Sequence, residues 1–183
     1  MHFTLGDLVM DIAQNAAESG ATVVQVTIEE TDRDFFFEVR DNGKGMTETE
    51  LERAKDPFQS DGKKHPQRRV GLGIPFLIQT AEQSGGTWNI ESTKGVGTTV
   101  KARFDLLNLD TPPIGDIPGL FRTILLFPGP EETIIQRSIS GDRRDFSYGL
   151  RKSELVSVLG ELESAQSLIL LDRYIRSMEE DKE

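Results

Sequence analysis

The sequence has no cysteine, and its 183 residues include only two histidines, His2 and His65. The lack of cysteine excludes disulfides, thiolate metal sites and cysteine nucleophiles, and two histidines leave little room for a histidine metal site or triad. Basic residues are also few, because 21 Lys and Arg stand against 31 Asp and Glu, for a formal charge of −10 at pH 7. Nucleic acids and anionic membranes are bound through clustered Lys and Arg, so neither partner is expected.

Long apolar runs are missing as well. No run approaches the length of a membrane-spanning helix, and the first residues do not resemble a signal peptide. Hydrophobic residues make up 36% of the chain, which is enough for a core. The length is typical of one domain, or of one domain with an extension. These features predict a cytoplasmic protein.

Apolar periodicity in residues 4–104 predicts a set of helices and strands. A helix capped by Thr4 and ended by Gly20 precedes two strands, at 22–29 and 35–41. After these come a short capped helix, a loop without periodicity, a glycine-led helix and a hairpin, at 47–55, 56–69, 71–86 and 88–104. This order predicts an α+β fold, a two-layer sandwich of a mixed, mainly antiparallel sheet with helices on one face.

Residues 107–119 are rich in proline and predict a linker between a first domain, 1–106, and an α+β extension, 120–183. The elements expected in the extension are strands at 121–127 and 133–140 and helical runs from 153 and 168. The pattern leaves open whether the extension is a small domain or an addition to the first sheet. A homodimer contact, a docking surface for a partner and packing within its own core all remain open as its role.

The glycine-led helix starts with Gly71 and Gly73, and Pro75 lies in its first turn. Glycines let the backbone approach a ligand closely, and a helix N-terminus offers free N–H groups and a positive dipole end. The segment therefore suits a phosphate group. A tight connection between two elements would explain the same glycines.

Three carboxylate or amide groups stand out before it. Asp11 and Asn15 are four residues apart on the first helix, and hence neighbours on one face. They fit either a solvated surface or a magnesium site, because Mg²⁺ prefers oxygen ligands. Asp41 continues the inward parity of its strand, where its carboxylate needs a donor such as an adenine amino group. The triplet that begins at Asp41, DNG, could also be a simple turn.

The loop at 56–69 carries cations, among them Lys63 and Lys64, in an otherwise acidic protein. It is either a solvated surface loop or a lid that closes over phosphates. Its position immediately before the glycine turn favours the lid.

Together these segments resemble the GHKL superfamily, the ATP-binding fold shared by gyrase, the heat-shock chaperone ATPase, mismatch-repair ATPases and histidine kinases. Four motifs carry the resemblance in the family order: DIAQNAAESGA at 11–21, DNGKGM at 41–46, RVGLGI at 69–74 and GVGTT at 95–99. The resemblance covers residues 4–104.

The resemblance implies specific roles in binding ATP and Mg²⁺. Asn15 would coordinate magnesium, Asp41 would accept from the adenine amino group, and Asp11 stands where the ATPase branch and the serine-kinase anti-sigma factors usually have a glutamate general base. Histidine kinases usually have a non-acidic residue at this position, so Asp11 favours the other branches of the superfamily over the histidine kinases. The remaining nucleotide contacts expected are Gly43, Gly45, Met46, Phe58, Arg69, Val70, Gly71, Leu72, Gly73 and Thr99, with Thr99 beside Asp41.

Two functions follow from this resemblance. The first is an enzyme of the ATPase or protein kinase type, in which Asp11 takes a proton and Lys63 or Lys64 neutralises developing charge. Because the first motif starts close to Met1, a protein partner would be phosphorylated in trans, with a serine kinase as one form. The second function is a nucleotide-gated binding module with negligible turnover. A degenerate fold that binds no nucleotide is the third reading.

Overall fold

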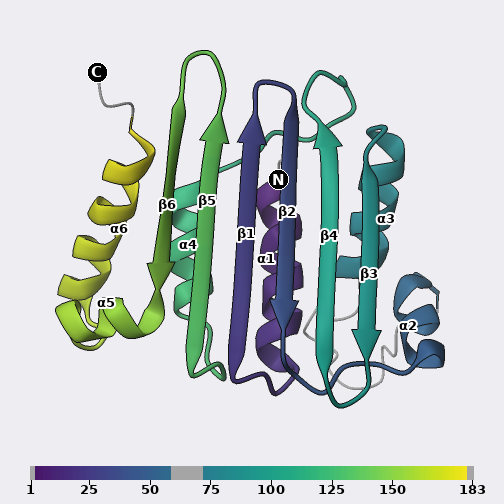
Figure 1. The fold of residues 1–183 in the computed structure, drawn as a ribbon, viewed down its shortest axis with the longest axis horizontal. Helices are drawn as coiled ribbons and strands as arrows, with labels where there is room; N and C mark the ends of the chain where they lie inside the picture. Colours follow the sequence, from purple (N-terminus) through teal and green to yellow (C-terminus); the bar gives the residue numbers. More distant parts are fainter. Residues whose placement is uncertain (1–2, 59–71, 181–183) are drawn as a thin grey trace.

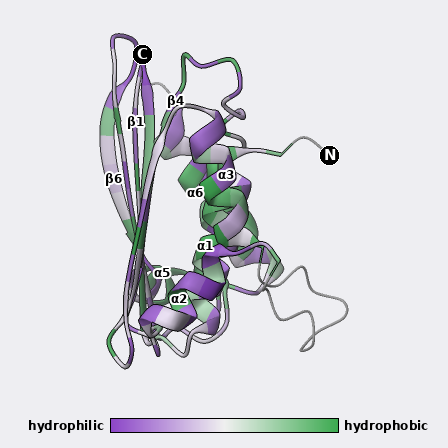
Figure 2. Cartoon of the chain, turned by 90° about the vertical axis from the view of Figure 1, so that its right-hand side faces the viewer, coloured by the Kyte–Doolittle hydropathy of each residue, from purple (hydrophilic) through white to green (hydrophobic). Residues whose placement is uncertain are grey.

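The computed structural model describes residues 3–58 and 72–180, which form one mixed sheet with the helices on one of its faces (Figures 1 and 2). The strand order is β3-β4-β2-β1-β5-β6, and only β1 and β5 pair in parallel among these strands. The strands are β1 (Val23–Thr31), β2 (Asp34–Asp41), β3 (Thr87–Thr93), β4 (Gly97–Asp105), β5 (Glu132–Ser140) and β6 (Asp145–Arg151). The helices are α1 (Leu5–Glu18), α2 (Glu48–Lys55), α3 (Gly73–Gln83), α4 (Ile117–Leu125), α5 (Lys152–Leu159) and α6 (Ala165–Glu179). The predicted fold class is confirmed.

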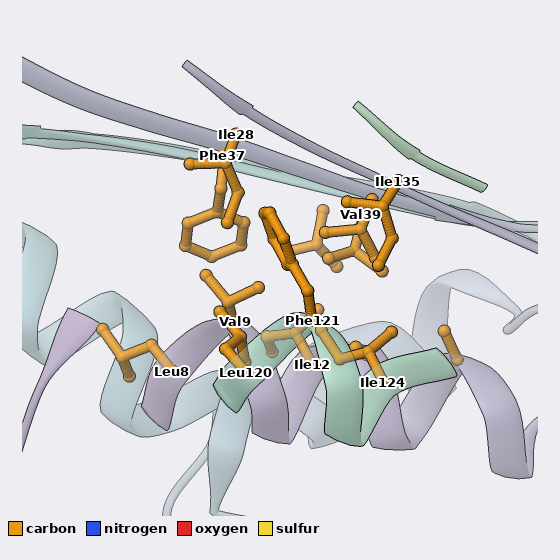
Figure 3. Packing of buried hydrophobic residues seen from close by; sticks show 14 of the residues in the cluster. Leu8, Val9, Ile12, Ile28, Phe37, Val39, Leu120, Phe121, Ile124 and Ile135 are labelled. Carbon is orange, nitrogen blue, oxygen red and sulfur yellow. The ribbon is translucent and has the colours of Figure 1, made fainter. Parts of the chain in front are cut away.

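Helix α1 lies at the centre of the helical layer, and its first turn is fixed by its sequence. The Thr4 hydroxyl accepts from the Asp7 N–H at 3.1 Å, and the Asp7 carboxylate accepts from the Thr4 N–H at 2.8 Å. Beyond this cap, Leu8, Val9 and Ile12 are buried at helical spacing. They pack against the inward residues of β1 and β2 (Figure 3). One face of α1 therefore belongs to the core, while its flank is exposed.

The strand predicted over 121–127 is wrong, because α4 occupies Ile117–Leu125. Pro118 stands in the first turn of this helix, and Leu120, Phe121 and Ile124 are buried at spacings of one, three and four residues. A short apolar run reads alike as a buried strand and as a buried helix, and here packing on α1 decides. Strand β6, which the sequence analysis missed, shows a period-two pattern of partly and fully buried residues.

The part of the chain after residue 106 joins the same sheet. Strand β5 lies in parallel beside β1, with Val26 opposite Ile135, and β6 pairs with β5 (Figure 1). The proline-rich segment also contacts α1, because the carbonyls of Pro113 and Ile114 accept from the Leu5 and Gly6 N–H groups, both at 2.9 Å. The extension is therefore an addition to the first sheet and does not form a separate sheet of its own.

Candidate functional site

The flank of α1 that carries Asp11 and Asn15 faces the start of α3. A methyl group placed on Gly73 would lie 3.2 Å from the Asp11 Cβ and 3.6 Å from the Asn15 Nδ2. Both side chains of α1 are exposed, whereas Gly73 is buried between the helices. A methyl group there would require the neighbouring atoms to move by a few tenths of an ångström, so glycine suits this close approach. The motif at 11–21 therefore meets Gly73, which belongs to the motif at 69–74, at one point of the surface.

Helix α3 begins without a side-chain cap within the described residues. Leu72 is its N-cap, and its carbonyl accepts from the Phe76 N–H at 2.9 Å. Pro75 has no N–H, so Gly73 and Ile74 supply the first-turn donors that the helix itself cannot satisfy. These donors and the positive end of the helix dipole lie next to Asn15, where an anionic group is favoured.

Asp41 ends β2 on the helical side of the sheet, as predicted. Its Oδ1 accepts from the Gly43 N–H at 2.8 Å and lies 3.2 Å from the Ser19 Oγ, whose single proton also has the Ala16 carbonyl as a closer acceptor at 2.7 Å. Within residues 3–58 and 72–180, no hydrogen bond reaches Oδ2. The carboxylate is partly buried, so one oxygen is fixed by the protein and the other is available to a donor.

The prediction that Thr99 lies beside Asp41 is wrong. In the register of β2 and β4, Asp41 is opposite Thr98, while Thr99 is opposite Arg40. The buried residues Val100 and Ala102 fix the parity of β4, so Thr98 shares the helical side with Asp41 and Thr99 points to the open face. Counting parity back from Val100 would have identified Thr98 from the sequence.

Two polar side chains that the sequence analysis did not single out hold this end of the sheet together. Asn42 Oδ1 accepts from the N–H groups of Thr22 at 3.0 Å and Val23 at 2.9 Å, which ties the end of β2 to the start of β1. The Ser92 hydroxyl accepts from the Met46 N–H at 2.8 Å and lies 2.8 Å from the Thr98 Oγ1. Ser92 has the inward parity of Ile90, which was the available signal.

Gly45 has the tightest backbone environment near Asp41. Its φ is +58°, and an added methyl group would lie 1.9 Å from the Thr93 carbonyl oxygen. We expect Gly45→Ala to lower the free energy of unfolding by more than about 2 kcal/mol, because strain and a backbone clash add. Gly95 is the matched control, since its φ is +78° and nothing lies within 4 Å of its added methyl group. Gly95→Ala should lower it by only about 1–2 kcal/mol, measured by urea unfolding. Equal losses in the two variants would contradict the clash.

Several predicted residues lie apart from this cluster. Phe58 is 94% exposed, so the described surroundings do not bury its ring. Lys63, Lys64, Arg69, Val70 and Gly71 lie outside the described residues. Within the described ranges, no group of three or more His, Cys, Asp or Glu side chains is placed to hold a metal ion. None of the described helices is long and apolar enough to cross a membrane.

The chain matches one protein family over more than half of its length. Residues 3–108 match the model for histidine kinase-, DNA gyrase B- and HSP90-like ATPases. The chain belongs to this family. The matched range contains α1, the end of β2, the start of α3 and the β3–β4 hairpin, which are the elements of the cluster described above.

Curated relatives of this ATPase-family chain include three kinds of bacterial kinase. The histidine protein kinase DivJ of Caulobacter vibrioides is 34% identical over 106 residues, which cover 56% of this chain and 18% of the kinase. The cell-division control histidine kinase PdhS of Brucella anthropi is 33% identical, with 46% and 9% covered. The signal transduction histidine-protein kinase AfsQ2 of Streptomyces coelicolor is 27% identical, with 61% and 21% covered. The chain thus spans about a fifth or less of these kinases.

Among solved structures, the catalytic domain of the histidine kinase ThkA matches at 20% identity and a TM-score of 0.40, covering 54% of this chain and 63% of that one. The relatives named above are all histidine kinases. Asp11 was expected to separate this chain from the histidine kinases, whereas these relatives are histidine kinases. This chain therefore combines an acidic residue at position 11 with relatives that are histidine kinases.

Proposed function

We propose that this chain binds Mg-ATP between α1, the end of β2 and the start of α3, and transfers the terminal phosphoryl group to a partner protein or to water. The observation that carries the proposal is that the two carboxylate oxygens of Asp41 differ in their hydrogen bonds. Its Oδ1 is held by the Gly43 N–H, while the described residues leave Oδ2 as an acceptor. The family match supports the same assignment, because it covers the residues concerned.

The adenine end of the ligand would lie at Asp41. An exocyclic amino group can donate to Oδ2 while Oδ1 keeps the Gly43 N–H, so the carboxylate need not reorient on binding. Thr98 lies opposite Asp41 and offers a second polar group on the same side of the sheet. Gly43 and Gly45 are both buried, and they form the backbone beneath this end of the site.

The phosphate end would lie at Asn15 and the start of α3. The first-turn N–H groups of Gly73 and Ile74 suit phosphate oxygens, with the buried Gly73 allowing the close approach of α3 to α1. Asn15 supplies a carboxamide oxygen of the kind that Mg²⁺ accepts, and phosphates and water would complete the shell. When bound, the ion neutralises phosphate charge. We assign to Lys63 and Lys64 a supporting electrostatic role, which their sequence position before the glycine turn suggests.

Asp11 is the group that would make the site catalytic. It lies one helical turn before Asn15 and contacts the start of α3, so a hydroxyl or water at the phosphate end is within its neighbourhood. Its carboxylate would take the proton of that nucleophile. We propose a protein substrate presented in trans, in a cytoplasmic setting; the relatives that are histidine protein kinases support a protein substrate. The assay identifies which side chain of the partner, serine or another, accepts the phosphoryl group.

Calorimetric titration of Mg-ATP into the wild type and Asp41→Asn tests the proposal. The variant keeps the Oδ1 acceptor but replaces Oδ2 by an amide that donates, so it faces the adenine amino group donor to donor. We expect binding about ten- to a hundredfold weaker. Asp34→Asn is the matched control, because Asp34 begins the same strand and pairs with Arg103 on the sheet.

Asp34→Asn should bind as the wild type does. Equal binding by Asp41→Asn and the wild type would remove Asp41 from the site. No heat and no competition with a fluorescent ATP analogue in the wild type would refute ATP binding altogether.

A further inference from the structure

Three polar side chains stand in one row across β3, β4 and β2, which lie side by side in Figure 1. Ser92 is opposite Thr98 in the register of β3 and β4, and Thr98 is opposite Asp41 in the register of β4 and β2. Residues opposite each other in paired strands share a face of the sheet, so all three lie on the helical side. Ser92 therefore lies on the side of Thr98 away from Asp41, and both hydroxyl residues are half-buried.

The Ser92 hydroxyl has three polar neighbours, and its single proton serves only one of them. Its oxygen accepts from the Met46 N–H at 2.8 Å. The same oxygen lies 2.8 Å from the Thr98 Oγ1 and 3.2 Å from the Gly97 carbonyl oxygen. A carbonyl oxygen only accepts, whereas a hydroxyl both donates and accepts. The direction of the bond between Ser92 and Thr98 therefore decides which group receives the Ser92 proton.

Two arrangements of the hydroxyl protons satisfy these contacts. In the first, Thr98 donates to Ser92 and Ser92 donates to the Gly97 carbonyl, which leaves the Thr98 oxygen as an acceptor. In the second, Ser92 donates to Thr98, which leaves the Thr98 proton for another acceptor. Within residues 3–58 and 72–180, Ser92 is the hydrogen-bond partner of the Thr98 hydroxyl. The second arrangement thus sets a donor, Thr98, opposite an acceptor, the Asp41 carboxylate.

We propose that Ser92 is a positioning residue for the nucleobase: by donating to Thr98, it makes the Thr98 hydroxyl a donor for the adenine ring nitrogen N1. This inference rests on the ATP binding proposed above. Adenine presents an amino donor with the acceptor N1 beside it. Asp41 accepts from the amino group, and Thr98 donates to N1, directly or through one water. A 6-oxo purine presents an acceptor and an N–H donor in the same places, so its oxygen would face the Asp41 carboxylate.

The same hydroxyl helps to fix the backbone of the glycine segment, because it accepts from the Met46 N–H. Two further bonds hold that segment without Ser92. The Gly95 N–H donates to the Lys44 carbonyl at 2.7 Å, and the Lys44 N–H donates to the Ser19 carbonyl at 3.1 Å. The segment is therefore attached to the β3–β4 hairpin on one side and to the end of α1 on the other. Because both bonds remain when the Ser92 oxygen is removed, we expect Ser92→Ala to fold.

Calorimetric titration with the magnesium complexes of ATP and 1-deaza-ATP tests the proposal, since 1-deaza-ATP keeps the amino group and lacks only the N1 acceptor. The wild type should bind ATP about tenfold more tightly than 1-deaza-ATP, the effect of one hydrogen bond. Ser92→Ala should weaken ATP binding about tenfold and bind the two nucleotides equally, because Thr98 is no longer directed at N1. Thr98→Val should also bind them equally, and the double variant should show no further loss of preference.

Thr99→Ala is the matched control, because Thr99 is next to Thr98 in β4 but has the opposite parity. It should keep the preference of the wild type for ATP. Circular dichroism checks the fold of each variant. Ser92→Cys, whose thiol is a weaker donor, takes the place of Ser92→Ala if that variant does not fold, and it should reduce the preference.

A Ser92→Ala protein that still prefers ATP about tenfold would overturn the proposal, however weakly it binds, because a purely structural role of Ser92 affects both nucleotides alike. A wild type that binds the two nucleotides equally would overturn it as well. Either result leaves the ATP site in place. A wild type that binds neither nucleotide removes the ATP site and this inference together, so the two failures are distinguishable.

Discussion

Replacing Arg137 by alanine is expected to lower the free energy of unfolding by about 3–5 kcal/mol, because it leaves buried charges without their partner. The Arg137 side chain is 1% exposed on the helical side of β5. It donates to Glu30 of β1, to Glu179 of α6 at 3.1 Å and to the Ser138 carbonyl at 3.1 Å. The Glu30 and Glu179 side chains are only 19% and 12% exposed. Water cannot fully replace the guanidinium there.

Tyr148 is part of the same network and adds to the cost. Its hydroxyl donates to the Glu179 Oε1 at 2.6 Å. Burial raises the pKa of Tyr148, and the bonded Glu179 carboxylate raises that pKa further. The phenol therefore stays protonated and keeps donating through the neutral range. Without Arg137, Glu179 retains the Tyr148 hydroxyl and the Arg144 guanidinium at 3.5 Å, but it loses the guanidinium that also neutralises Glu30.

Urea unfolding followed by circular dichroism measures the loss, and Arg122→Ala is the matched control. Arg122 also pairs with a carboxylate on α6, Asp172, but its side chain is 39% exposed. A solvated pair is worth less than about 1 kcal/mol. If Arg137→Ala costs no more than Arg122→Ala, the network does not hold α6 on the sheet. The double change of Arg137 to Met and Glu179 to Gln should recover only part of the lost stability, because it removes the Glu179 charge together with Arg137 but leaves that of Glu30.

Local patterns predicted most of the fold because they depend on nearby residues. The caps at Thr4 and Thr47, and the alternation that turns Asp41 inward, act over at most a few positions, and the structure confirms them. The strand over 133–140 was predicted as well, but the significance of Arg137 within it was not. Its partner Glu179 is 42 residues away, and no local pattern specifies that contact.

The same distinction applies to the site. Gly73 was expected at a helix start, and the spacing of Asp11 and Asn15 placed them on one face. That these three residues meet depends on the packing of α3 on α1, which follows from the fold rather than from either motif. The expectation that Thr99 lies beside Asp41 failed for another reason. It rested on the resemblance alone, whereas the register with β2 is set by Val100 and its inward neighbours.

Asp11→Asn is expected to lower phosphate release or phosphoryl transfer by about 10²–10⁴-fold, since a general base contributes on that order. The substitution keeps the shape of the side chain against the start of α3, where the Asp11 Cβ would lie 3.2 Å from a methyl group on Gly73. It removes only the basic carboxylate. The dissociation constant for Mg-ATP should therefore change by less than about threefold, measured by calorimetry.

Two further variants on the same residue and helix sharpen the result. Glu18→Gln removes a carboxylate two turns further along α1, where Glu18 accepts from the Gln14 side chain at 2.9 Å, and should leave turnover unchanged. Asp11→Glu keeps a carboxylate and lengthens it by one methylene, so turnover should persist. A loss in Asp11→Asn that Asp11→Glu does not share then identifies the carboxylate as the base, rather than the packing of α1 on α3.

The remaining outcomes separate the enzyme from a nucleotide-gated binding module. Unchanged turnover in Asp11→Asn would show that Asp11 is not the base, and the proton would have to leave by water. A wild type that binds Mg-ATP but releases no phosphate would favour the binding module, provided that candidate substrate proteins were also present. In that case Asp11 would contribute its charge to the phosphate end of the site, and Asp11→Asn would strengthen ATP binding by removing a like charge near the phosphates.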